Sequence, residues 1–201
     1  MTARVDNEKD ERWRIFCAVA LPEDVRARCS AHIAQLRELQ REARVSWERM
    51  EKLHITLKFL GEIERERVEA LSRAAHRAAM SIAPFHLSLE GAGAFPPRGT
   101  PRVLWLGVKD HTGALAKLQQ HLEDECAQEN FPREERAFHP HLTIARLRAP
   151  QGAHHLAAKH RDLGFSPIEF PIRELIVLRS ELGSNGSRYT VVVRHELTVA
   201  K

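Results

Sequence analysis

Two stretches of the chain place a histidine and a threonine two residues apart inside apolar, strand-like sequence: LHITLKFLG at 53–61 and HLTIARL at 141–147. Side chains alternate between the two faces of a β-strand, so residues two apart share a face. The first stretch therefore predicts a polar face with His54, Thr56 and Lys58. The opposite face is apolar and is expected to belong to the core: Ile55, Leu57 and Phe59.

The second stretch repeats this arrangement, with His141 and Thr143 on one face and Leu142 and Ile144 behind them. One such pattern is weak evidence in a chain with 12 histidines, because an exposed strand face carries it by chance. Two copies on predicted strands favour a shared function. The polar faces then line either solvent or a cleft.

The remaining sequence predicts an α+β protein with mainly antiparallel sheets, because strand and hairpin patterns outnumber helical ones. Further strands are expected at 13–22, 85–95, 103–108, 170–180 and 188–197. Helices are expected at 23–44, 64–80 and about 115–130, where apolar residues recur at helical spacing. The stretches 46–53 and 148–155 are expected to be a connection and a turn. A strand–helix–strand unit that ends in HIT is echoed by one that ends in HLT.

Length and composition fit one globular domain. With 201 residues, 43% of them hydrophobic and 29% charged, the chain can bury a core of ordinary size. We expect residues 1–11 to form a disordered leader and residues 12–201 to form a single domain. No stretch approaches the roughly 20 apolar residues of a membrane span, and the N-terminus lacks the apolar core of a signal peptide. We therefore expect a cytoplasmic monomer with no membrane association and no obligatory protein partner.

The charge balance permits an anionic ligand without requiring one. The formal charge is +4 and the pI is near 9.2, which is compatible with RNA or a nucleotide. Many Lys and Arg residues alternate with Glu, as in RELQREAR and EIERERVEA. Such alternation is typical of solvated helix faces rather than of a binding patch.

The two histidines suit general acid–base catalysis. Imidazoles titrate near neutral pH, so one can accept a proton while the other donates one. The hydroxyls of Thr56 and Thr143 can donate hydrogen bonds to phosphate oxygens, and Lys58 or an arginine can offset negative charge in the transition state. This set requires no nucleophilic side chain, metal or other cofactor. It fits cleavage of a phosphoester by water or by a ribose hydroxyl.

The sequence around both motifs, LHITLKFLG and FHPHLTIARLR, resembles the paired signatures of the two-histidine (2H) phosphoesterases. Within that superfamily the chain is similar to the bacterial and archaeal RNA 2′,3′-cyclic phosphodiesterases, formerly called 2′-5′ RNA ligases. The likeness includes IFCAVALPEDVR, GAFPPRGTPRVLWLGV and LRSELGSNGSRYTVVVRHEL, and it covers the chain from about Trp13 to Leu197.

The resemblance implies a bilobal fold in which two mainly antiparallel sheets with outer helices are related by pseudo-twofold symmetry around a central cleft. It also implies metal-independent opening of terminal 2′,3′-cyclic phosphates to 2′-phosphates, on RNA or small nucleotides. His54 and His141 would be catalytic, with Thr56 and Thr143 on the phosphate. Because the 3′ oxygen leaves, we assign its protonation to His54 and the activation of water to His141.

The resemblance also points to residues beyond the two motifs. Arg146 matches the basic residue that the family carries three positions after the second threonine. Strict alternation puts Arg146 on the apolar face, so it reaches phosphate only if the strand ends or bulges near Ala145. Lys58 is a second candidate for the phosphate because it shares a face with His54. Independently of the resemblance, four aromatic residues could stack on a base: Phe16, Phe95, Trp105 and Tyr189. As a group they are expected to pack in the core or between strands, and the first candidates among them are Phe16 and Tyr189.

A metal site is a weaker interpretation of the same residues. The histidines that suggest one are His139, His141, His154 and His155, but a proline separates the first two and no carboxylate or thiolate stands at ligand spacing. The cysteines are far apart and form no C-x-x-C pair, which disfavours a disulfide framework and a thiolate zinc site: Cys17, Cys29 and Cys126.

Two other functions use the same cleft. RNA ligation would join a cyclic phosphate to a 5′-hydroxyl that replaces water as the nucleophile. A non-catalytic nucleotide- or RNA-binding module would keep the pocket without turnover. Both histidines and both threonines are intact, which makes the binding module the weakest of the three interpretations.

Overall fold

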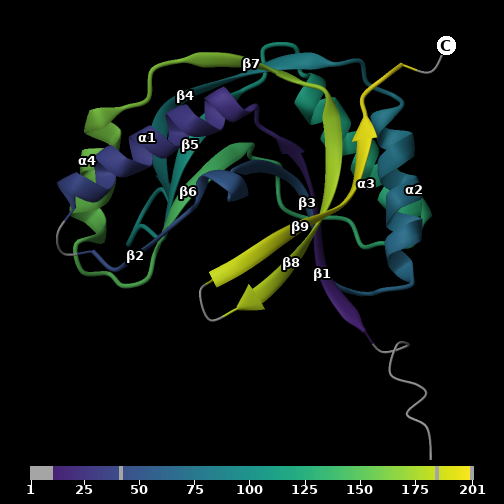
Figure 1. Ribbon diagram of the computed structural model, residues 1–201, viewed down its shortest axis with the longest axis horizontal. Coiled ribbons are helices and arrows are strands. Elements are labelled where there is room, and N and C mark those ends of the chain that lie inside the picture. Colours follow the sequence, from purple (N-terminus) through teal and green to yellow (C-terminus); the bar gives the residue numbers. More distant parts are fainter. Residues whose placement is uncertain (1–10, 41–42, 184–185, 200–201) are drawn as a thin grey trace, which may run out of the picture.

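Two antiparallel β-sheets form the centre of the fold (Figure 1). The computed structural model describes residues 11–40, 43–183 and 186–199. The strands are β1 (Arg12–Ala20), β2 (Val45–Trp47), β3 (His54–Glu64), β4 (Phe85–Phe95), β5 (Val103–Lys109), β6 (His141–Leu147), β7 (Ile168–Ile172), β8 (Glu174–Gly183) and β9 (Gly186–Glu196). The helices are α1 (Glu23–Leu39), α2 (Arg67–Ala79), α3 (Ala114–Gln128) and α4 (Ala153–Leu163), with the 3-10 turn η1 (Met50–Lys52) before β3.

The strand orders of the two sheets repeat one pattern. One sheet has the order β3-β1-β8-β9, and the other has the order β2-β6-β5-β4-β7. In each sheet a histidine–threonine strand, β3 or β6, pairs with the first strand of its own strand–helix–strand unit, β1 or β5. The topology therefore agrees with the α+β class and with the repeat that the sequence indicates.

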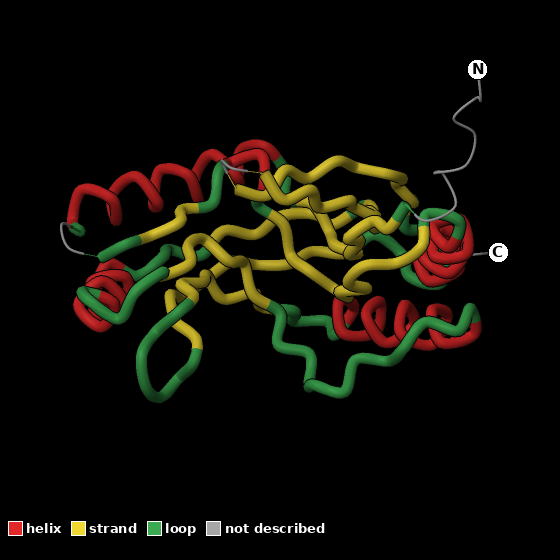
Figure 2. The backbone as a smooth tube through the Cα atoms, turned by 90° about the horizontal axis from the view of Figure 1, so that it is seen from below, coloured by secondary structure: helices red, strands yellow, loops and turns green. Residues whose placement is uncertain are grey.

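The helix of each strand–helix–strand unit packs on the side of the molecule that holds the sheet of the other unit. α1 follows β1, yet it packs beside α4, which lies against β4 of the other sheet (Figure 1). α3 follows β5, yet it packs against α2 and β3. In the perpendicular view the strands occupy the middle and the helices lie outside them (Figure 2). The two halves are therefore interlocked, because each sheet takes part of its cover from the other half.

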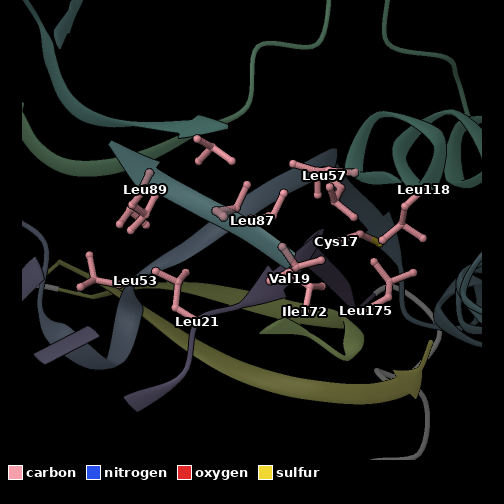
Figure 3. Close-up of a cluster of buried hydrophobic side chains, with 14 of the residues drawn as sticks. Cys17, Val19, Leu21, Leu53, Leu57, Leu87, Leu89, Leu118, Ile172 and Leu175 are labelled. Carbon is pink, nitrogen blue, oxygen red and sulfur yellow. The ribbon is translucent and has the colours of Figure 1, made fainter. Parts of the chain in front are cut away.

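One apolar core joins the inner faces of both sheets (Figure 3). Side chains from strands of both sheets meet there with Leu118 of α3, and almost all of them are inaccessible to solvent: Cys17, Val19, Leu57, Leu87 and Ile172. Burial of apolar surface contributes roughly 25 cal/mol per Å². Because both halves bury their apolar faces in one core, the folding of each half depends on the other.

The strand β3 contains one extra residue directly after Thr56. Thr56 pairs with Ala18 and Lys58 pairs with Cys17, which are neighbours in β1, so Leu57 has no partner of its own. Such a β-bulge shifts the alternation of side chains by one position. Leu57 and Lys58 are accordingly both buried, at 4% and 3% exposure.

The strand β6 contains the same irregularity at the equivalent position. Thr143 pairs with Trp105 and Ala145 pairs with Leu104, so Ile144 is the extra residue. Ile144 and Ala145 are both fully buried. In both histidine–threonine strands the alternation of side chains thus shifts at the same position, one residue after the threonine.

Most of the expected elements are present, but the single strand expected at 170–180 is wrong. The chain passes from one sheet to the other at Arg173, so this stretch forms two strands, β7 paired with β4 and β8 paired with β1. Two further elements were not expected. The three-residue strand β2 lies in the stretch that was expected to be a connection, and α4 begins inside the stretch that was expected to be a turn. α4 starts after Gly152, whose φ of 68° is left-handed, and its inner face is built largely from alanines, so its apolar periodicity is weak. Residues 1–10 of the predicted disordered leader lie outside the described residues, and Glu11 forms ion pairs with Arg65 and Arg179.

In the part of the chain that the structure describes, no helix combines the length and the apolar character needed to span a bilayer.

A buried pair of histidines connects α1 to α4 and β5. His160 Nε2 donates to the carbonyl oxygen of Trp105 at 3.0 Å, because a carbonyl only accepts. His160 Nδ1 is then an acceptor, and His32 Nε2 donates to it at 3.2 Å. This chain of hydrogen bonds requires His160 to be neutral. The pKa of His32 is lowered to about 4, mainly by burial and also by the neighbouring His160, so His32 is neutral as well at pH 7.

The free energy of unfolding is expected to fall as the pH drops from about 6.5 to about 4. In this window the unfolded chain protonates His32 whereas the folded protein does not, which costs at most about 3 kcal/mol. Urea unfolding across this range measures the effect. His32→Gln keeps an N–H donor without titrating, so it should reduce the pH dependence by the His32 contribution, whereas the exposed His86→Gln should leave the slope as in the wild type. Equal slopes in all three proteins would contradict the prediction.

Candidate active site

A cleft of about 570 Å³ lies where β3 of one sheet faces β6 of the other. His54 and Thr56 line it from β3, and His141 and Thr143 line it from β6. All four side chains are half-buried. The two polar strand faces therefore line one shared cleft rather than separate surfaces.

Both histidine rings are oriented in the same way. His54 Nδ1 lies 2.6 Å from the carbonyl oxygen of Lys52, and His141 Nδ1 lies 2.8 Å from the carbonyl oxygen of His139. Since a carbonyl only accepts, Nδ1 donates in both cases, and the lone pair of each neutral ring is on Nε2. The hydroxyl of Thr56 donates to His54 Nε2 at 3.1 Å. Each imidazole is thus held in the tautomer that a general base needs.

Both histidines are neutral at pH 7 in this cleft. The pKa of His54 is lowered to about 4, mainly by burial and also by Arg146 and His141, against the raising effect of the Lys52 carbonyl. Burial also lowers the pKa of His141, and Arg146 adds to the effect. The negative charge of a bound phosphate would offset the positive charge of Arg146 and raise both pKa values. One of the rings would then become protonated when the substrate binds.

Arg146 lines the cleft because β6 bulges at Ile144. The condition set by the sequence, a bulge near Ala145, is therefore met. Arg146 Nε lies 3.8 Å from Glu48 Oε1, and the backbone N–H of Glu48 donates to the carbonyl oxygen of Ile144 at 2.9 Å. Glu48, which was not anticipated, thus contacts both the cation and the bulge that presents it.

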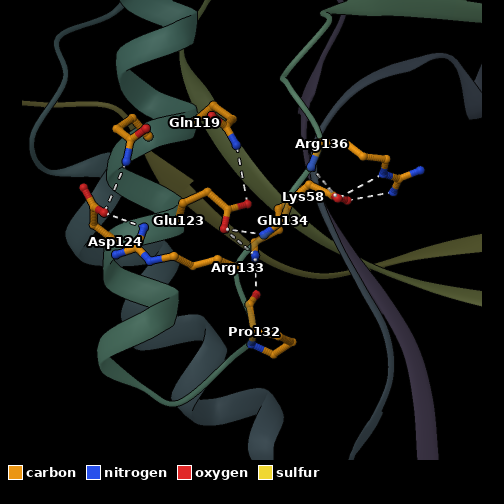
Figure 4. A network of polar contacts seen from close by, with 9 residues as sticks. Lys58, Gln119, Glu123, Asp124, Pro132, Arg133, Glu134 and Arg136 are labelled. Carbon is orange, nitrogen blue, oxygen red and sulfur yellow. Dashed lines mark hydrogen bonds and ion pairs between the residues drawn. The ribbon is translucent and has the colours of Figure 1, made fainter.

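Lys58 does not share the cleft face of His54, so that prediction is wrong. The bulge at Leu57 turns Lys58 inward, where its Nζ lies 2.6 Å from Glu123 Oε2 and 2.8 Å from the carbonyl oxygen of Pro132 (Figure 4). Glu123 Oε2 also accepts from the backbone N–H of Glu134 at 3.2 Å. Lys58 therefore holds α3 and the segment that leads to β6, rather than a phosphate.

The prediction of Phe59 as a core residue is also wrong, for the same reason. Phe59 is 56% exposed and lines the cleft. It occupies in β3 the position that Arg146 occupies in β6, three residues after the threonine. One half of the cleft thus presents an aromatic ring where the other half presents a cation.

The candidates for base stacking differ in accessibility. Phe16 borders the cleft, but it is only 3% exposed and packs against His54, with ring centroids 4.8 Å apart. Its ring therefore supports the histidine and does not offer a face for a base. Tyr189 is half-buried, lines the cleft and contacts His54 edge to face at 5.4 Å. The open aromatic surface of the cleft consists of Phe59, Phe95 and Tyr189.

The cleft is basic. Among the described residues that line it, the cations outnumber the single carboxylate of Glu48: Arg14, Lys52, Arg136, Arg146 and Arg148. Positive charge that lines a concave surface attracts phosphate-bearing ligands. The interleaved charge pattern of the sequence did not reveal this cluster, because its members come from segments far apart in the chain.

The residues considered for a metal do not converge. His154 and His155 lie in the first turn of α4, both exposed to solvent, whereas His141 lies in the cleft. Across the described ranges 11–40, 43–183 and 186–199, no group of three or more His, Cys, Asp or Glu side chains is arranged to hold a metal ion. The three cysteines are buried and free.

Two matching sheets that each bring one histidine–threonine strand to a shared cleft define the architecture of a two-histidine phosphoesterase. Residues 22–184 match the family model of the 2′-5′ RNA ligase superfamily, and the chain belongs to that superfamily. The RNA 2′,3′-cyclic phosphodiesterase of Thermotoga maritima is 32% identical over 180 residues, covering 89% of this chain and 92% of the relative. The enzyme of that name from Thermus thermophilus is 34% identical over 193 residues, covering 92% and 90%.

Solved structures agree with this assignment. TT0787 of Thermus thermophilus superimposes with a TM-score of 0.76 at 30% identity, covering 94% of this chain and 100% of that chain. E. coli LigT complexed with 3′-AMP superimposes with a TM-score of 0.73 at 28% identity, covering 94% and 99%. The comparisons confirm the expected family, the bilobal α+β fold and the expectation of an enzyme.

Replacing Arg146 by Gln is expected to raise the pKa of both His54 and His141, because the guanidinium lowers both values. NMR titration of the imidazole resonances measures the two pKa values directly. Arg146→Lys keeps the charge and should keep both values low. If Arg146→Gln left both pKa values where they are in the wild type, Arg146 would not act on the histidines electrostatically.

Replacing Lys58 by Met is expected to destabilise the protein by about 3–5 kcal/mol, because it leaves the buried Glu123 carboxylate without its cation. Chemical denaturation measures the change. The double variant Lys58→Met with Glu123→Met should recover much of the loss, and Lys117→Met, on the exposed face of α3, should change stability by less than about 0.5 kcal/mol. A Lys58→Met protein as stable as the Lys117→Met protein would refute the structural role.

Proposed function

We propose that the protein is an RNA 2′,3′-cyclic phosphodiesterase that hydrolyses terminal 2′,3′-cyclic phosphates to 2′-phosphates by two-histidine acid–base catalysis. The observation that carries this proposal is the matched orientation of His54 and His141. Both rings donate from Nδ1 to the carbonyl two residues earlier, and both line one basic cleft. The relatives named RNA 2′,3′-cyclic phosphodiesterase support the choice of substrate.

In the proposed reaction, the oxygen of a water molecule attacks the phosphorus while the bond from phosphorus to O3′ breaks. His141 Nε2 takes the proton from the water, and protonated His54 gives its proton to O3′, so the 2′-phosphate remains. The two histidines exchange protonation states, which a proton transfer with solvent restores. No metal or other cofactor takes part in these steps.

The low pKa of His54 shapes this assignment. Because the pKa is about 4 in the free protein, His54 acts as the acid only if the bound phosphate raises that value. The anionic substrate would therefore take part in the acid–base catalysis, since its negative charge would raise the pKa that burial lowers. His54 and His141 exchange roles if the phosphate raises the pKa of His141 more.

The threonines and Arg146 would bind the phosphate oxygens. In the free protein the hydroxyl of Thr56 donates to His54 Nε2, so rotation of this hydroxyl toward a bound phosphate would release the ring nitrogen for proton transfer. Arg146, 46% exposed at its side chain, would then place a guanidinium beside the charge that develops in the transition state. Phe59 and Tyr189 would provide the apolar surface for the terminal nucleoside.

An oligonucleotide with a terminal 2′,3′-cyclic phosphate, incubated with the protein in EDTA, is expected to yield the 2′-phosphate. His54→Ala and His141→Ala should each lower kcat/KM by about 10²- to 10⁴-fold, because each removes one proton-transfer group. His154→Ala, an exposed histidine of α4, serves as the matched control. Chromatography that separates 2′- and 3′-phosphates measures both the product and the rate.

The outcome also separates the alternatives. A 3′-phosphate product, or activity that survives both histidine substitutions, would overturn the proposal. Tight nucleotide binding without turnover would favour a binding module. Adding an RNA with a 5′-hydroxyl tests ligation, since a joined product would show that a ribose hydroxyl replaces water in the same site.

A further inference from the structure

A second hollow continues the cleft beyond His141. It has a volume of about 1040 Å³, and Phe95 and His141 line both the cleft and this hollow. The two spaces therefore meet at the catalytic ring of β6. Ligand pockets of roughly 300–1,000 Å³ hold drug-sized molecules, so the hollow has room for a nucleoside.

The walls of this hollow are aromatic. The rings of Phe95 and Trp105 lie 5.3 Å apart and tilted by 36°, and Phe165 forms part of the lining. The indole of Trp105 lies directly over Gly93, where an added Cβ would stand 2.2 Å from a ring atom. Any side chain at this position would clash with the indole, so the close contact of Trp105 with β4 requires a glycine.

The backbone that carries Trp105 is held from behind. The carbonyl oxygen of Trp105 accepts from His160, which accepts in turn from His32. At the rim, Lys109 and Glu90 form an ion pair at 3.6 Å, and His139 is exposed. An aromatic lining with a few polar groups at its rim suits a nucleobase, which has a π-face and a hydrogen-bonding edge.

The two halves of the molecule differ at this point. The hollow that adjoins His54 has a volume of only about 270 Å³, and its lining includes the ion pair of Arg194 and Glu174. Among the described residues, the larger hollow and its aromatic lining therefore lie beside His141 and not beside His54. The pseudo-twofold symmetry of the fold does not extend to the surroundings of the two histidines.

We propose that the hollow beyond His141 binds a second nucleobase of RNA, next to the nucleotide whose cyclic phosphate lies between the histidines. This inference rests on the proposed function and adds a subsite to it. The base comes either from the nucleotide preceding the cyclic phosphate or from a second strand with a 5′-hydroxyl. The nucleophile and the leaving oxygen lie on opposite sides of phosphorus. The source of the base therefore also determines whether His141 lies on the side of the nucleophile or on the side of the leaving oxygen.

The first experiment compares kcat/KM for a dinucleotide and a mononucleotide that both end in a 2′,3′-cyclic phosphate. If the base comes from the substrate strand, the dinucleotide should be preferred by about 5- to 150-fold, as expected for one stacked base. Trp105→Leu should lower this ratio toward one, and Phe165→Leu provides a second, milder test of the same wall. Trp13→Leu replaces another partly buried tryptophan, outside both hollows, and should keep the wild-type ratio.

The second experiment follows tryptophan fluorescence as nucleotides bind. A dinucleotide with a 3′-terminal phosphate should quench emission in the wild type and in Trp13→Leu, but much less in Trp105→Leu. If the base comes from a second strand, a dinucleotide with a 5′-hydroxyl and no phosphate should quench instead, in protein already saturated with a mononucleotide phosphate. Either pattern supports the subsite and identifies its source.

The proposal is overturned if the length preference is absent and neither dinucleotide quenches Trp105 beyond the mononucleotide. That result would leave the proposed function intact, since the mononucleotide cyclic phosphate would still be opened. Failure to open any cyclic phosphate would instead refute the proposed function, and the fluorescence titration would still decide whether the hollow binds a base.

Discussion

The single extra residue that follows each threonine determines how this active site is built. Because Leu57 in β3 and Ile144 in β6 have no partners of their own, the alternation of side chains shifts after the histidine–threonine pair. The shift brings Phe59 and Arg146 into the cleft, three residues after the threonines. Two straight strands would keep these side chains on the core side and would turn lysine or alanine toward the phosphate. The bulges thus decide which chemistry the cleft contains.

The same irregularity gives Lys58 a structural role that connects the two halves. Turned inward, Lys58 bonds Glu123 of α3 and the carbonyl of Pro132, in the segment that leads to β6. That segment ends at His139, whose carbonyl orients the ring of His141. The strand that carries His54 therefore helps to fix the orientation of His141. Two further features hold the halves together: α1 and α3 each pack with the other half, and both sheets share one core. Neither half is therefore fully packed without the other.

The two halves of the cleft match at His54 and His141 and differ in the residues around these two rings. Both histidines bond a carbonyl two residues earlier, and burial lowers the pKa of both. Around them, however, the β3 side presents Phe59 and Tyr189, whereas the β6 side presents Arg146 and opens into the larger hollow. A reaction with a distinct leaving group and nucleophile needs two unlike sides. In the proposed reaction the matched pair would supply the proton transfer, and the unmatched neighbours would distinguish the two ends of the substrate.

Periodicity and motif spacing in the sequence by themselves determined the fold class, most of the strands and helices, and the four motif residues, because each of these depends on local pattern. The tertiary structure alone decided where the alternation breaks, since a bulge is set by pairing with β1 or β5 rather than by the bulged strand. The bulges therefore overturned the predicted positions of Lys58 and Phe59 and placed Arg146 on the cleft side of β6. The fold also buried Phe16 against His54. The positions of Glu48 and of the basic residues that line the cleft could also be known only from the fold. These residues come from distant segments and converge only when the segments pack together.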